Sequence, residues 1–228
     1  MTSRLFTSAA WAGLVTGIIA ALLTILLVVP LILQGEVFEA GAHTHDLGTV
    51  QHDHPDAAPG ATAAGLWGRH AQTFAMSLVT YLGFALLLVA GFALAARRGV
   101  RIDTRAGLLW GIAGFLAVQL SPAAGLPPEL PGTGAADLAS RQVWWVATVI
   151  ASTAGIALIV TARGLASVLA GAALLALPHV VGAPAPESFA GTAPPELAAQ
   201  FVARALAVSA ACWAVLGATA GWFWSRGS

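Results

Sequence analysis

Residues 5–33 read LFTSAAWAGLVTGIIAALLTILLVVPLIL, and this stretch contains no charged side chain. An α-helix needs about 20 apolar residues to cross the hydrocarbon core of a bilayer, so the stretch is long enough to span a membrane. A signal peptide has a shorter apolar core, of about 7–15 residues, although Ala40-Gly41-Ala42 is similar to a cleavage site. We therefore expect a retained transmembrane helix here.

The rest of the chain has the same character. Of its 228 residues, 58% are hydrophobic and 9% are charged, and the mean hydropathy is +0.82, whereas soluble domains are about 25% charged. The sequence predicts an all-α integral membrane protein, a single transmembrane domain over residues 1–228 with six spans, or five if the fifth, broken by Pro178, only enters the bilayer. The expected spans are Leu5–Leu33, Ala71–Ala96, Ala106–Leu120, Gln142–Ala162, Gly164–Val181 and Ala199–Trp224.

The positive charges, all arginines, are divided unevenly between the two sides of these spans. Seven lie on one side (Arg4, Arg97, Arg98, Arg101, Arg105, Arg163 and Arg226) and three on the other (Arg69, Arg141 and Arg204). Cytoplasmic loops are the arginine-rich ones, so with six spans we expect both termini in the cytoplasm of a bacterial inner membrane. Segments 34–70, 121–141 and 182–198 are then periplasmic loops, and the net charge of zero suggests no nucleic-acid partner.

Nine of the ten carboxylates fall on the periplasmic side; Asp103 is the exception. Carboxylates contribute little to membrane orientation, so the asymmetry has another cause. One reading is an acidic surface that attracts cations, and the alternative is a set of ordinary solvated loops.

Segment 34–70 is rich in groups that bind metals. It contains two His-x-His pairs beside several carboxylates, and its candidate ligands are His43, His45, His52, His54, Glu36, Glu39, Asp46 and Asp53. Imidazole with carboxylate suits a borderline divalent transition metal, without choosing among Co²⁺, Ni²⁺, Zn²⁺ and Cu²⁺. Neighbouring i and i+2 side chains share a face only in extended backbone, and the glycines and prolines here argue against a helix. A polar spacer with incidental histidines remains the alternative.

Two further candidates lie outside this segment. Glu129 stands in the proline-rich run Pro127–Pro131, and His179 follows the helix-breaking Pro178. Interrupted helices often mark transporter binding sites, so both residues are candidate metal ligands. The alternatives are a glutamate that complements a helix N-terminus and a histidine at the membrane interface. The single cysteine, Cys212, excludes an intramolecular disulfide and a thiolate metal cluster.

Short motifs in a fixed order run through nearly the whole chain. They are VPLIL (29–33), EVFE (36–39), GLLWG (107–111), GLPPELPG (125–132), RQVWWVAT (141–148) and PHVVGAP (178–184). In these motifs the chain resembles the CbtA family of cobalt-transporter subunits. The family carries an acidic residue before the arginine that opens the second span, whereas Gly68 precedes Arg69 here, so an ion pair at Arg69 stays unassigned.

The resemblance implies a membrane subunit for cobalt uptake, linked to cobalamin biosynthesis. Co²⁺ would be its substrate, with Ni²⁺ or Zn²⁺ as alternatives, and no organic cofactor or enzymatic activity is expected. A small one-span CbtB-like subunit would be its partner, and association with a second copy stays open. The positions carried over from the family are Glu36, Glu39, His43, His45, Glu129, Arg141 and His179.

A second function class remains open: a non-transporting scaffold, or a protein that delivers metal to a partner. The expected spans hold almost no ionisable groups, whereas ion pathways usually carry them. The chain has no H-E-x-x-H motif and no recognisable nucleophile elbow, so an intramembrane enzyme is not expected.

Overall fold

The computed structural model describes residues 2–46, 63–162, 164–186 and 191–226. Within these ranges the chain is helical and forms no strand, which confirms the expected all-α membrane fold. The elements are α1 (Thr2–Leu23), η1 (Thr24–Val28), α2 (Val29–Asp46), α3 (Ala63–Arg97), α4 (Thr104–Phe115), η2 (Leu116–Leu120), α5 (Ser121–Ala123), α6 (Leu138–Thr161), α7 (Leu165–Val181) and α8 (Pro195–Arg226). The elements η1 and η2 are single turns of π-helix inside longer helices.

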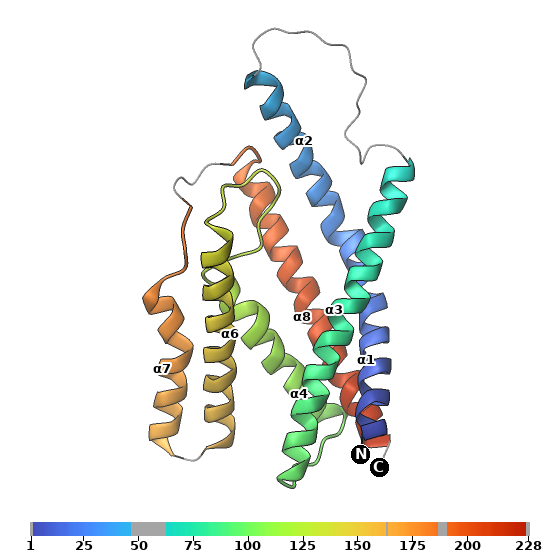
Figure 1. Ribbon diagram of the computed structural model, residues 1–228, viewed down its shortest axis with the longest axis vertical. Coiled ribbons are helices and arrows are strands. Elements are labelled where there is room, and N and C mark those ends of the chain that lie inside the picture. The colour runs from blue at the N-terminus through green and yellow to red at the C-terminus, as the bar shows by residue number, and fades with distance from the viewer. Residues whose placement is uncertain (1, 47–62, 163, 187–190, 227–228) are drawn as a thin grey trace.

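The helices run back and forth between two ends of an elongated bundle (Figure 1). We call the end that carries both termini the terminus end, and the opposite one the loop end. The continuous helix α1–η1–α2 leaves the terminus end and α3 returns to it as a first hairpin, and α4–η2–α5 with α6 forms a second. From there α7 runs toward the loop end beside α6, and α8 returns to the terminus end packed against α4 and α1. At the terminus end, Arg4 Nε donates to the Trp224 carbonyl at 2.8 Å and the guanidinium stacks on that ring.

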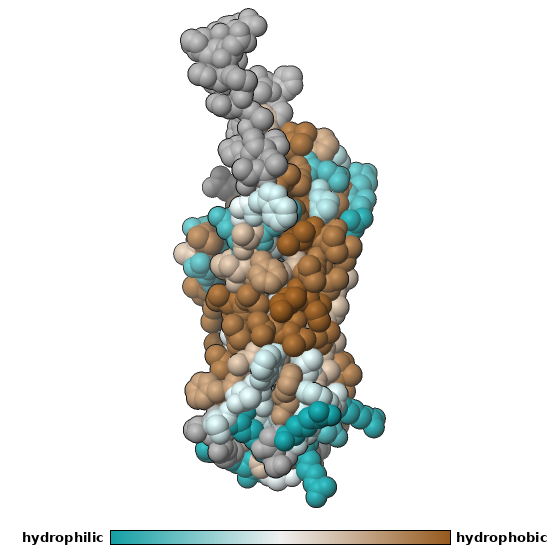
Figure 2. Space-filling view, turned by 90° about the vertical axis from the view of Figure 1, so that its right-hand side faces the viewer, coloured by the Kyte–Doolittle hydropathy of each residue, from teal (hydrophilic) through white to brown (hydrophobic). Residues whose placement is uncertain are grey.

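Among the described residues, five helices are long and apolar enough to cross a membrane. They cover Ser3–Ala40, Gly65–Arg97, Thr104–Ala123, Leu138–Thr161 and Pro195–Arg226. The remaining apolar helix, α7, has 17 residues and ends before Gly182, whose φ is 90°. At about 1.5 Å per residue α7 is about 25 Å long, less than the roughly 30 Å hydrocarbon core. Figure 2 shows a hydrophobic band across the middle of one face, between hydrophilic ends.

The helices extend further toward the loop end than the sequence predicts. The first helix continues past the expected end at Leu33 to Asp46, and α3 begins at Ala63 rather than Ala71. A helix satisfies its backbone hydrogen bonds internally, so it can continue into water where its apolar pattern has ended. Both flanks of segment 34–70 are therefore helical.

The tightest contact in the bundle is between the backbones of α4 and α8. Gly107 and Gly111 on α4 face Gly217 and Gly221 on α8. A Cβ atom added to Gly217 would lie 2.7 Å from the Gly111 Cα, and one added to Gly107 would lie 2.8 Å from the Gly221 Cα. Small residues allow such approach, and close packing is what holds helices together in lipid. Two of the three G-x-x-x-G pairs in the sequence therefore pack against each other.

Similar contacts join the other helices. The third pair, Gly13 and Gly17 on α1, packs against the backbone of α3, and Gly155 on α6 packs against Gly171 on α7. Phe92 of α3, 0% exposed, meets the rings of Trp110 on α4 and Trp224 on α8 edge-on, in the core formed by α1, α3, α4 and α8. The α6–α7 hairpin attaches to this four-helix core through η2 and α5.

Each π-helical turn ends two residues before a proline. The Val29 N–H donates to Thr24 O ahead of Pro30, and the Ser121 N–H donates to Leu116 O ahead of Pro122. Proline has no N–H, and its ring clashes with the carbonyl four residues earlier. The wider turn accommodates that ring without ending the helix. Turns of this kind are frequent at functional sites.

Replacing Gly217 with alanine should destabilise the fold, because its Cβ would meet the backbone of α4. Overpacking of this kind typically costs about 1–3 kcal/mol. The matched control is Gly83→Ala in α3, where an added Cβ meets nothing within 4 Å and alanine is the better helix former by about 1 kcal/mol. Unfolding in detergent should show a loss for the first variant only; equal stability of both would contradict the backbone contact.

The expected orientation can be tested by labelling, because the chain has one cysteine, Cys212, which is 0% exposed. In a Cys212→Ala background, a membrane-impermeant maleimide should label cells carrying Ala139→Cys at the loop end. It should spare cells carrying Val100→Cys at the terminus end until the membrane is permeabilised. Both positions are exposed in the fold, so the reverse pattern would place the loop end in the cytosol.

Candidate metal site at the loop end

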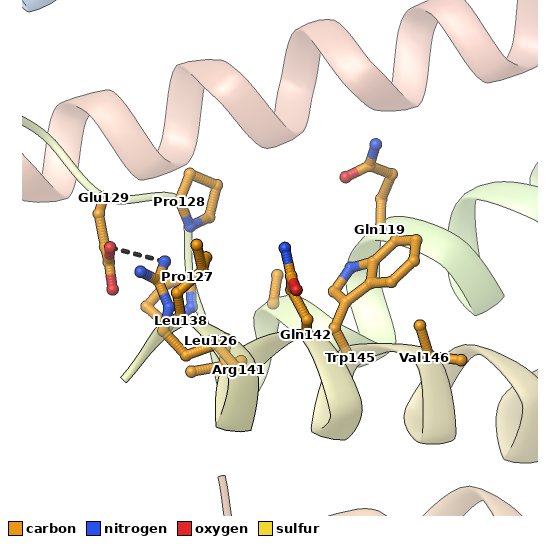
Figure 3. A pocket seen from close by; sticks show the side chains of 11 residues that line it. Gln119, Leu126, Pro127, Pro128, Glu129, Leu138, Arg141, Gln142, Trp145 and Val146 are labelled. Carbon is orange, nitrogen blue, oxygen red and sulfur yellow. Dashed lines mark hydrogen bonds and ion pairs between the residues drawn. The ribbon is translucent and has the colours of Figure 1, made fainter. Parts of the chain in front are cut away.

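A cavity of about 560 Å³ opens at the loop end. Its walls are η2–α5, the proline-rich segment that follows, and the first turns of α6. Its polar lining consists of Glu129, Arg141, Gln119 and Gln142, beside the ring of Trp145. In Figure 3, Glu129 and Arg141 lie together at one end of this group and Gln119 lies toward the other.

Glu129 and Arg141 form an ion pair, which the sequence did not predict although it singled out both residues. Arg141 Nη2 lies 2.7 Å from Glu129 Oε2, and the two side chains are 28% and 31% exposed. The Nε atom of Arg141 is buried and has no hydrogen-bond partner among the described residues. The arginine thus holds the carboxylate by one hydrogen bond and leaves a donor unused.

Local sequence places both partners. Pro127, Pro128 and Pro131 restrict the backbone around Glu129. Asp137 caps α6, because its side chain accepts hydrogen bonds from the backbone N–H and the hydroxyl of Ser140, each at 2.9 Å. These bonds favour the charged carboxylate and lower the pKa of Asp137. The cap starts α6 one turn before Arg141, which directs the guanidinium at the preceding loop.

A second ion pair joins the first hairpin at the same end. Arg69 Nη1 and Nη2 of α3 lie 2.6 Å and 3.2 Å from the two carboxylate oxygens of Glu36 on α2. Because Gly68 stands where the family has an acidic residue, the sequence offered no adjacent partner for Arg69. The partner, Glu36, comes from the neighbouring helix α2. Glu36 was expected as a metal ligand, but in this structure both of its carboxylate oxygens accept hydrogen bonds from Arg69.

The loop around Glu129 is held between two other segments. On one side α2 packs on it: a Cβ added to Gly35 would lie 2.8 Å from Leu130, and one added to Gly132 would lie 3.4 Å from the Glu39 Cβ. On the other side Thr192 N–H donates to Gly132 O at 3.2 Å. Glu36, Glu39 and Glu129 thus lie on connected elements, yet the described residues contain no group of three His, Cys, Asp or Glu that could hold a metal.

The expected geometry of the first His-x-His pair is wrong. His43 and His45 belong to α2, whose helical backbone continues to Asp46, whereas extended backbone was expected. Gly41 does not end the helix, since an isolated interior glycine costs only about 1 kcal/mol. Positions i and i+2 do not share a face of a helix, so adjacent imidazoles no longer follow from the spacing. His52, Asp53 and His54 lie outside the described residues.

His179 lies apart from Glu129 and is not part of the cavity lining. It is exposed in the last turn of α7, where its Nε2 is 3.4 Å from Ser121 Oγ, and Ser121 is 2.7 Å from the buried Ser152. Trp144 meets the imidazole edge-on at 5.9 Å and donates to Pro178 O at 3.2 Å. His179, Ser121 and Ser152 thus form a row of polar groups between α5, α6 and α7. Apart from Pro178, which drew attention to His179, nothing in the sequence indicated that these three side chains would meet.

Comparison with known proteins agrees with this architecture. The family described as "Probable cobalt transporter subunit (CbtA)" matches residues 2–225, from the first turn of α1 to the last turn of α8. No curated protein and no solved structure matches the chain. Because the family match covers nearly every residue of a membrane-type helical bundle, the chain belongs to the CbtA family.

Proposed function

We propose that this protein is the membrane subunit of a cobalt-uptake system and captures Co²⁺ at its loop end. Membership of the CbtA family supports the coarse role, a transporter subunit with cobalt as cargo. The observation that supports the finer proposal is the cavity of about 560 Å³ at the loop end, whose lining includes the carboxylate of Glu129 and the amides of Gln119 and Gln142. Carboxylate and amide oxygens, like imidazole nitrogens, are ligands for divalent cations.

The His-x-His segment acts in this proposal as the first point of capture. His43, His45, His52 and His54, with Asp46 and Asp53, would bind Co²⁺ from the periplasm. Glu36, Glu39 and Glu129 lie on the elements that connect this segment to the cavity, and His179 marks a separate polar path. Ni²⁺ and Zn²⁺ suit the same donors, so the preference for cobalt is itself part of the proposal.

The family description calls its members subunits, which supports a complex. We propose a small one-span CbtB-like protein as the partner, in a bacterial inner membrane, in service of cobalamin biosynthesis. A second copy of the chain could occupy the same role. Lipid or a partner would cover α7, whose outward residues Leu165, Val180 and Val181 are 73–82% exposed.

One observation favours the alternative, a scaffold or metal-delivery protein without transport of its own. The buried polar side chains of the described bundle are Ser8, Thr16, Thr148 and Ser152, and none of these carries a charge. Ion pathways through membranes usually carry ionisable groups. In the transport proposal the path beyond the cavity therefore lies at the interface with the partner.

Replacing His43, His45, His52 and His54 with alanine should raise the cobalt concentration for half-maximal uptake. The rise should be about tenfold if the segment contributes about 1.4 kcal/mol to capture. Uptake of radioactive cobalt into cells expressing the chain with its partner measures it. His70→Ala, which removes a histidine at the same end but outside the pairs, is the control. Unchanged uptake at limiting cobalt would exclude the segment as the capture site.

Cobalt binding should also weaken in acid, because only neutral imidazole binds a metal. With an ordinary histidine pKa of about 6.5, affinity should be full above that pH and fall by about tenfold or more between pH 7.5 and 5.5. Calorimetry on the purified full-length protein measures the change. The four-alanine variant should lose most of this pH dependence; equal affinities of the unaltered protein at both pH values would argue against imidazole ligands.

A further inference from the structure

The cavity offers a second kind of cation site, different from the histidine segment. Its polar groups are the carboxylate of Glu129 and the amides of Gln119 and Gln142, so its donors are oxygens. In Figure 3 Gln142 lies between Arg141 and the Trp145 ring, and Gln119 lies near that ring on the side away from Glu129. Oxygen donors without imidazole or thiolate discriminate little among divalent cations.

The size of the cavity suits a cation that keeps its water. A water molecule occupies about 30 Å³ of liquid, so six waters fill about 180 Å³, well within the 560 Å³ available. A hydrated ion would contact the carboxylate and the amides largely through its own water molecules. Such binding is weak, which suits a position that an ion must also leave.

The carboxylate of Glu129 already has a positively charged partner, the guanidinium of Arg141. Arg141 holds Glu129 by a single hydrogen bond of 2.7 Å, its Nε has no partner among the described residues, and both side chains are about one-third exposed. Exposed ion pairs with imperfect geometry contribute little, so an incoming divalent cation can break this one. The pair Glu36–Arg69, with bonds at 2.6 Å and 3.2 Å, uses both oxygens and is held more firmly.

We infer that Arg141 is a tethered competitor of the cargo: its guanidinium occupies Glu129 when the cavity is empty, and a hydrated divalent cation displaces it. This inference rests on the proposed function and assigns Gln119 and Gln142 to the cation site. The displaced arginine stays close and repels the ion, which keeps affinity low. When the ion moves on, the guanidinium returns to Glu129 and resets the site.

The test measures Co²⁺ binding to full-length protein in lipid nanodiscs by equilibrium dialysis. All variants are made in the background that lacks the four loop histidines, so that the cavity site is observed alone. Arg141→Gln should tighten binding at least about tenfold, because a divalent ion about 5 Å from a positive charge is repelled by this much even in water. Arg141→Lys keeps the charge and should bind as the background protein does.

Two controls separate competition from a structural role. Glu129→Gln should abolish binding whether or not Arg141 is present, and Arg101→Gln, which removes an exposed arginine at the terminus end, should leave the affinity unchanged. In uptake assays Arg141→Gln should lower both the half-saturating cobalt concentration and the maximal rate, since the ion is held longer. Thermal melting of each variant checks that the fold is kept.

The possible failures are distinct. If Arg141→Gln folds but binds Co²⁺ with unchanged or weaker affinity, while Glu129→Gln abolishes binding, the arginine is not a competitor and the proposed capture function stands. If Glu129→Gln binds as well as the background protein does, the cavity is not a cation site and the inference is overturned. If the unaltered protein binds no Co²⁺ at all, the proposed function itself fails.

Discussion

The contact between the backbones of α4 and α8 is the constraint on which the rest of the structure depends. In lipid, helices gain little from burying apolar side chains, because the surrounding acyl chains are equally apolar. Close approach is therefore the main source of association, and Gly107, Gly111, Gly217 and Gly221 provide it. This contact sets the path of α4. Its continuation, η2–α5, then carries Gln119 and Ser121 to the loop end, where the first lines the cavity and the second meets His179.

The first two hairpins share one arrangement. In each, a helix leaves the terminus end, contains a π-helical turn two residues before a proline, and leads to a glutamate. In each, the returning helix carries an arginine near its start that pairs with this glutamate. The last two helices differ: Pro178 lies in α7, and Arg204 of α8 reaches the Leu27 carbonyl of η1 at 3.4 Å instead of a glutamate. At the loop end Arg69 and Arg141 thus offset the charges of Glu36 and Glu129.

Particular residues show how far sequence reasoning reached. Glu129 and Arg141 could be singled out because prolines flank one and a recognisable motif starts with the other, but their ion pair could not be predicted, since it depends on where α6 begins relative to the loop. The partner of Arg69 was missed because it lies on another helix, 33 residues earlier. The spacing of His43 and His45 was interpreted for extended backbone, and this was wrong because α2 continues through Gly41 to Asp46.

By itself, the sequence determined that the chain is a bundle of apolar helices with acids and histidines gathered in a few segments, because hydropathy and composition are local properties. It also singled out Pro178 as an interruption of the fifth span, since proline removes a backbone donor, and α7 continues through Pro178 only to Val181. Only the tertiary structure decided which glutamate meets which arginine, that Gln119 and Gln142 line one cavity, and that His179 stands apart from it. Those outcomes depend on helix register and on the depth to which glycines let two backbones approach, and neither quantity is local in the chain.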